Sequence, residues 1–100
     1  MSVIEIIQFT THPGTTAETL QQALGQPDQE LARIGGVQDR TLYQDAGTEN
    51  GRLLDYRWET LTEAQESMSK VAATDAFAQL MTLVADPQAM SMNYGIPAQS

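Results

Sequence analysis

The chain has 100 residues, of which 13 are acidic and 5 basic, so its formal net charge is −8, and it contains no cysteine. This length predicts a single domain over residues 1–100 with a modest core. The negative charge argues against nucleic acid or an anionic membrane as partner, because phosphate binding needs clustered Lys and Arg. Without cysteine, disulfides and thiolate metal sites are excluded.

The first half of the chain begins in a strand. Val3 to Thr10 is β-branched and apolar at most positions, with Glu5 as its one charge, which predicts a strand covered on both faces. Thr15-Thr16-Ala17-Glu18 has the spacing of a capping box and opens a helix. Gly25-Gln26-Pro27 is expected to kink this helix or divide it into two pieces. Gly35-Gly36 is expected to end it.

Two strands and a turn follow. Val37 to Asp45 alternates weakly, and residues 46–51 form a turn that contains Asn-Gly. Arg52 to Glu59 alternates clearly, with Leu54, Tyr56 and Trp58 on one face. The start of the chain has no basic leader, so a cytoplasmic location is expected.

The last third repeats the pattern of a helix and then a strand. Thr60 and Glu63 form a second capping box, and a fresh helical start is expected at Thr74-Asp75. Asp86-Pro87 closes this helical region. Residues 90–94 alternate as a final strand, and residues 95–100 are expected to be a loose tail.

The order strand, helix, strand, strand, helix, strand predicts an α+β, ferredoxin-like βαββαβ fold with an antiparallel four-stranded sheet. Two helices cover one face of such a sheet. We assign to that face the even-numbered residues Ile4, Ile6, Leu42, Leu54, Tyr56, Trp58, Met90, Met92 and Tyr94. The other face then carries Val3, Glu5, Ile7, Phe9, Val37, Thr41, Tyr43, Leu53, Asp55 and Arg57. That face is too apolar for water and too charged for a core, which favours a homodimer that pairs two sheets.

The residues Tyr56-Arg57-Trp58-Glu59-Thr60-Leu61-Thr62-Glu63-Ala64 resemble the antibiotic-biosynthesis-monooxygenase-like proteins of the dimeric α+β barrel superfamily. The break before Asp75-Ala76-Phe77 and the turn Ile34-Gly35-Gly36-Val37 are similar to the same family, and the resemblance covers residues 3–94. It implies a homodimer whose two sheets form a barrel, and a cavity between sheet and helices in each subunit. It also places Leu80 where the haem-degrading branch has its axial histidine, so haem degradation is not expected.

Six residues are candidates for a site. Trp58 is able to stack on an aromatic substrate or simply to fill the core. Tyr56 and Tyr94 are able to bond a substrate hydroxyl or a backbone group, and Met68 and Met81 suit either an adaptable apolar pocket or the core. His12, the only histidine, is our candidate for a general base, although a histidine in a loop is more often a surface residue.

Two functions remain open. The first is a cofactor-independent monooxygenase acting on an aromatic, quinol or polyketide-like molecule, in which the substrate anion itself reduces dioxygen. The second is a non-catalytic dimeric module that binds a small apolar ligand. No haem, flavin, nicotinamide or metal is expected, because the sequence has neither a cluster of strong ligands nor a glycine-rich turn that holds a dinucleotide.

Overall fold

The computed structural model describes residues 2–98. Its elements are β1 (Val3–Thr10), α1 (Ala17–Ile34), β2 (Val37–Gln44), β3 (Gly51–Trp58), α2 (Leu61–Ala72), α3 (Asp75–Met81), the short 3₁₀ helix η1 (Pro87–Ala89) and β4 (Ser91–Gly95). The expected α+β fold with an antiparallel four-stranded sheet is confirmed.

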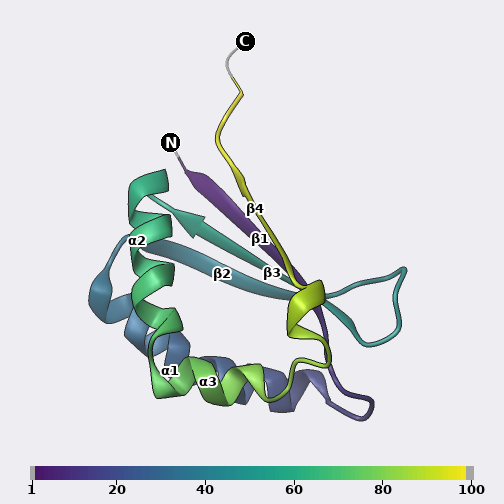
Figure 1. Ribbon diagram of the computed structural model, residues 1–100. Coiled ribbons are helices and arrows are strands. Elements are labelled where there is room, and N and C mark those ends of the chain that lie inside the picture. Colours follow the sequence, from purple (N-terminus) through teal and green to yellow (C-terminus); the bar gives the residue numbers. More distant parts are fainter. Residues whose placement is uncertain (1, 99–100) are drawn as a thin grey trace.

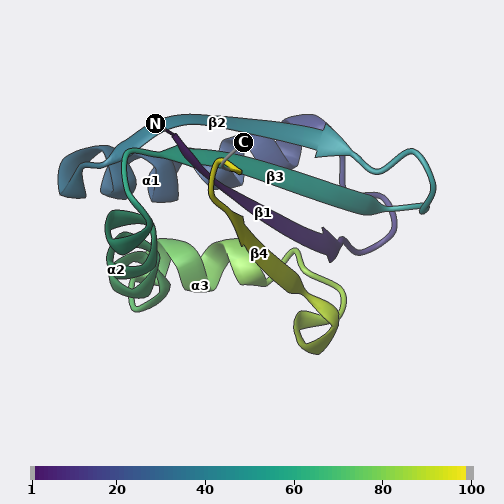
Figure 2. The same ribbon diagram turned by 90° about the horizontal axis from the view of Figure 1, so that it is seen from above.

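The strands lie in the order β2-β3-β1-β4, which Figure 2 shows across the sheet. Helices α1, α2 and α3 all lie on one side of this sheet (Figure 1). In the part of the chain that the structure describes, no helix lies over the other side. The core therefore occupies the single layer between the sheet and the helices, and we call this side of the sheet the helix face.

The helix starts follow local side-chain chemistry. The Thr60 hydroxyl accepts a hydrogen bond from the backbone N–H of Glu63 at 3.1 Å, and Thr74 caps α3 by accepting from Phe77 at 3.2 Å. Both starts were predicted. In α1, however, the N-cap is Thr16, which accepts from Thr19. The predicted capping box between Thr15 and Glu18 is therefore wrong by one residue.

Pro27 does not divide α1. The helix runs without interruption from Ala17 to Ile34, so the expectation of two helical pieces is wrong. A proline inside a helix removes one backbone hydrogen bond and costs roughly 3 kcal/mol. Here the ring is buried in the apolar core, and that burial offsets part of the cost. The helix ends as predicted at Gly35, whose φ of 98° suits a residue without Cβ.

The assignment of faces is confirmed for β3 and β4 but wrong for β1. The register pairs odd-numbered residues of β1 with even-numbered residues of β3, as Glu5 with Tyr56. The helix face therefore receives Val3, Glu5, Ile7 and Phe9, all buried, while Ile4 and Ile6 lie on the outer face. Val37 also packs against the core, because the register shifts between Val37 and Asp39. The sequence does not reveal the phase of β1, since its two faces are almost equally apolar.

Candidate functional site

One row of ionisable side chains crosses the helix face from edge to edge. Arg40 of β2 pairs with Tyr56 of β3, Tyr56 pairs with Glu5 of β1, and Glu5 pairs with Tyr94 of β4. Residues that are paired across antiparallel strands point to the same face and lie side by side. The fold thus gathers four ionisable groups from four strands in one line beneath the helices.

Glu5 is the centre of this row. Its side chain is fully buried at 0% exposure, and its Oε1 accepts a hydrogen bond of 3.0 Å from the indole Nε1–H of Trp58. Its other oxygen, Oε2, has no hydrogen-bond partner among residues 2–98. A buried carboxyl group with a free oxygen is costly to the fold, so its retention calls for an explanation.

Burial raises the pKa of Glu5 above its ordinary value, and the neighbouring Trp58 indole and Tyr94 hydroxyl lower it only in part. Burial, reinforced by the negative charge of Glu5, likewise raises the pKa of Tyr94 to about 12. The pKa of Tyr56 is raised as well, first by burial and then by the charges of Asp28 and Glu5, while Arg40 opposes the rise. At neutral pH both tyrosines are therefore neutral hydroxyl groups beside the Glu5 carboxyl.

Trp58 lies where its phase in β3 predicts. It is completely buried on the helix face, and its ring lies 6.1 Å from that of Tyr56, with 29° between the planes. The indole holds the Glu5 carboxyl from one side while its rings pack in the core. Trp58 therefore joins the apolar and the polar parts of this face.

An apolar cavity of about 30 Å³ lies next to this row, between the sheet and the helices. Its lining includes the predicted residues Tyr56, Met68 and Met81, together with Ile7, Phe9, Pro27, Leu31, Leu54, Val71, Phe77, Leu80, Val84 and Met90. A volume of this size holds about one or two water molecules. An aromatic ligand therefore enters only if the walls move, and flexible methionines in the lining favour such movement.

The other predicted residues lie elsewhere. Trp58 and Tyr94 are outside the cavity lining. Tyr94 belongs to the row of ionisable side chains, and Trp58 donates a hydrogen bond to Glu5 of that row. His12 is exposed in the turn after β1, where its backbone N–H donates to the carbonyl of Leu83 at 3.3 Å. The structure therefore brings Tyr56, Met68 and Met81 together around the cavity and leaves His12 apart from them.

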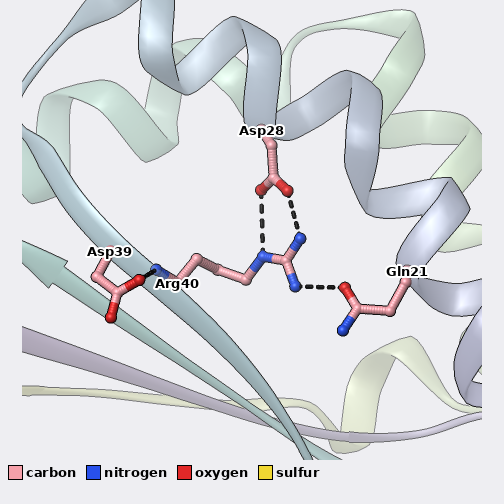
Figure 3. Close-up of polar contacts among 4 residues, drawn as sticks. All are labelled: Gln21, Asp28, Asp39 and Arg40. Atoms are coloured by element: carbon pink, nitrogen blue, oxygen red, sulfur yellow. Dashed lines mark hydrogen bonds and ion pairs between the residues drawn. The ribbon is translucent and has the colours of Figure 1, made fainter.

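Arg40 closes the row at the β2 edge (Figure 3). Its guanidinium forms a two-pronged ion pair with Asp28 of α1, and its Nη1 donates to Gln21 at 2.7 Å. A paired guanidinium of this kind fixes a strand to a helix with defined geometry. Arg40 thus positions α1 over the sheet and leaves Glu5 without a cationic partner.

Sequence reasoning missed Glu5, Arg40 and Asp28. Glu5 was placed on the outer face, and the structure corrects this because the register turns it toward Trp58. The sequence did contain a signal for the burial of Glu5. It is the one acidic residue in an otherwise apolar strand, and the chain has a single tryptophan, expected in the core, that could donate to it. Only the register shows that the two side chains meet.

Within residues 2–98 no three His, Cys, Asp or Glu side chains gather in a way that could hold a metal ion. In the same range, none of the helices combines the length and the apolar character that crossing a membrane requires.

The fold is shared with solved structures, one of which is described as a cofactor-independent oxygenase. SnoaB, a cofactor-independent oxygenase from Streptomyces nogalater, superposes with a TM-score of 0.75 at 17% identity, covering 99% of this chain and 95% of SnoaB. A Bordetella bronchiseptica protein named as a candidate antibiotic biosynthesis monooxygenase gives a TM-score of 0.71 at 18% identity over 98% of both chains. Rv0793 from Mycobacterium tuberculosis gives 0.64 at 16% identity over 100% and 98% of the two chains.

No protein-family model matches the chain, and no curated protein matches its sequence. The structural likeness therefore establishes the fold, which is that of the antibiotic-biosynthesis-monooxygenase-like proteins. At these sequence identities, the structural likeness does not identify a substrate.

Proposed function

We propose that this protein is a cofactor-independent oxygenase that acts on an aromatic or quinol-type small molecule in the cavity between the sheet and the helices. The observation that carries the proposal is the juxtaposition of an apolar cavity with a buried carboxyl group, an indole N–H and two neutral tyrosines. The fold supports it, since one similar structure is described as a cofactor-independent oxygenase.

The chemistry requires little from the protein. A polycyclic phenol in its keto form carries an acidic CH₂ group beside the aromatic ring. This group loses a proton, and the resulting anion gives electrons to dioxygen. The carbon gains one oxygen atom as a carbonyl, the second oxygen atom leaves as water with the two hydrogens, and no external reductant is consumed. The protein binds the ring, accepts the proton and keeps water away from the anion.

His12 remains our proposed base for a substrate that lies at the mouth of the cavity. It lies two residues after the end of β1, and the neighbouring Thr11 forms a bridge with Val84, which lines the cavity. The imidazole would have to turn inward from its exposed position to reach a substrate. We expect His12→Gln to slow turnover and to leave binding intact.

We also propose that the protein works as a homodimer. The outer face of the sheet carries the partly exposed apolar residues Ile4, Ile6 and Leu53 and the exposed Tyr43. Asp55 and Arg57 lie on the same face, with 3.6 Å between their charged atoms. An apolar sheet face with a few charges is suited to pairing with a second copy of itself.

A second candidate function is a non-catalytic module that binds a small apolar ligand. The small cavity favours it, because its volume is only about 30 Å³ and its lining includes neither Trp58 nor His12. Such a module needs only an adaptable apolar site.

Oxygen uptake distinguishes the two functions. A panel of quinols and polycyclic phenols is mixed with the protein in an oxygen-electrode cell, and binding is followed separately by calorimetry. We expect one dioxygen consumed per molecule of a substrate, and much slower uptake by Val71→Phe, which fills the cavity. Binding without oxygen uptake would establish the second candidate, and neither binding nor uptake would overturn both.

A further inference from the structure

Glu5 Oε2 is one of three buried side-chain polar atoms without a hydrogen-bond partner among residues 2–98, the others being Arg52 Nε and Asp55 Oδ1. The indole N–H of Trp58 occupies Oε1, whereas Oε2 is buried and has no partner among residues 2–98. Arg40, which lies in the same row, is already paired with Asp28 on the far side of Tyr56. No cation on the helix face therefore compensates Glu5 within the part of the chain that the structure describes.

Two neighbours of Glu5 on the sheet line the apolar cavity. Ile7, two residues further along the same face of β1, lines the cavity. Tyr56, the cross-strand partner of Glu5, lines it as well. Glu5 itself is not among the lining residues, so a ligand reaches its carboxyl group only when the cavity enlarges past Ile7 and Tyr56. The indole of Trp58 holds the carboxyl group in place.

We propose that Glu5 is the polar anchor of the ligand: its Oε2 accepts a hydrogen bond from an O–H or N–H donor on an aromatic molecule held in the cavity. The inference rests on the proposed function, because it uses the same cavity. It assigns Glu5 a role in binding. The fold of β1 does not itself require a carboxyl group at this position.

The donor character of the ligand follows from the partners already present. Trp58 offers only an N–H, so it orients Glu5 by claiming Oε1. The second oxygen of an ionised carboxylate accepts and does not donate. A ligand hydroxyl that meets this oxygen in a dry chamber forms a charge-assisted bond, about twice as strong as a neutral one. A ligand that presents an ether oxygen at the same point leaves two acceptors facing each other.

The test uses 1-naphthol and 1-methoxynaphthalene, which share a ring system and differ in the donor. The chain has one tryptophan, so the ¹⁵N-labelled protein gives one indole N–H resonance. This N–H donates its hydrogen bond to Glu5. Titrations followed at this resonance at about pH 8 compare the wild type with Glu5→Gln. Glu59→Gln, an exposed acid at the end of β3, is the matched control.

We expect the wild type and Glu59→Gln to bind 1-naphthol at least about tenfold more tightly than the ether, which corresponds to about 1.4 kcal/mol. In Glu5→Gln the amide oxygen goes to Trp58 and the NH₂ takes the place of Oε2, so the preference should vanish or reverse. Retained binding of the ether by this variant would show that it is folded.

Equal affinities for the two ligands in all three proteins would overturn the role of Glu5 while leaving the cavity as a ligand site. Absence of any shift of the indole resonance with either ligand would overturn it too. Oxygen uptake with the wider panel then decides the proposed function independently.

Discussion

At the scale of single residues, the buried carboxyl group of Glu5 sets a pH dependence of stability. Burial raises the pKa of Glu5 in the folded chain above the ordinary value of 4.5. Below that value both the folded and the unfolded chain hold the proton, so the free energy of unfolding carries no penalty from Glu5. As the pH rises through the raised pKa, the unfolded chain has already released its proton, and the fold loses stability.

Glu5→Gln removes this loss. The variant should have nearly the wild-type stability at about pH 4 and become progressively more stable than the wild type as the pH rises to about 8. Each unit of pKa shift is worth about 1.4 kcal/mol. Urea unfolding at several pH values measures the difference, and curves that stay parallel across this range would show that the carboxyl group is not perturbed by folding.

Trp58 combines a large buried ring with a hydrogen bond of 3.0 Å to Glu5 Oε1. Trp58→Ala should cost about 3–5 kcal/mol of unfolding free energy because it empties the core. Trp58→Phe should cost about 1–3 kcal/mol because it leaves the buried carboxyl group without its donor. Denaturant unfolding checks both values. A loss well below 1 kcal/mol in the alanine variant would mean that the ring lines an open cavity instead of filling the core.

At the scale of elements, the connection from β3 to α2 depends on a single cap. The Thr60 hydroxyl accepts from the Glu63 N–H at 3.1 Å and also contacts the Glu63 carboxylate at 3.0 Å. Thr60→Ala should therefore cost about 1 kcal/mol. Thr62→Ala, at an exposed position of the first turn, is the control and should change stability by less than about 0.5 kcal/mol. Thermal unfolding would contradict the assignment if the two variants were equally stable.

The elements were predictable where their local signals are strong. The alternation around Tyr56 and the Thr60 and Thr74 caps locate β3, α2 and α3, because periodicity and capping act over a few residues. The phase of β1 was not predictable, since Ile4 and Ile6 are as apolar as Val3 and Ile7. Continuity of α1 through Pro27 depends on burial against other elements, which no local pattern contains.

The candidate site was predictable only in its apolar part. The phase of β3 and the helical stripe brought Tyr56, Met68 and Met81 to one place, as the cavity shows. The polar part depends on the β1 register, which pairs Glu5 with Tyr56 and Tyr94 and brings it to Trp58. A charged residue in a strand is normally expected to face water, so Glu5 was assigned to the wrong face.

At the scale of the whole molecule, the open face of the sheet calls for a partner. We expect one dimeric species at micromolar concentration, with an interface above roughly 2,000 Å² in total. Ile6→Lys places a charge on the outer face and should shift sedimentation toward the monomer. Gln65→Lys, on the exposed side of α2, should leave the dimer intact. A wild-type protein that sediments as a folded monomer would rule out the barrel-like pairing of two sheets.

The layer between the sheet and the helices holds a cavity of only about 30 Å³, which is too small for an aromatic ring. Ligand entry requires movement of one wall, and α3 is the shortest of the three α-helices at 7 residues. Phe77, Leu80 and Met81 of α3 all line the cavity. A short helix with few internal hydrogen bonds is the wall that opens at least cost.

A crystal structure of the protein grown with 1-naphthol tests the account most directly. We predict that the ring occupies an enlarged cavity against Tyr56 and Phe77, with its hydroxyl oxygen about 2.5–3.0 Å from Glu5 Oε2 and the Trp58–Glu5 bond retained. A ligand found only on the outer face of the sheet, or in the cavity with its hydroxyl turned away from Glu5, would contradict it.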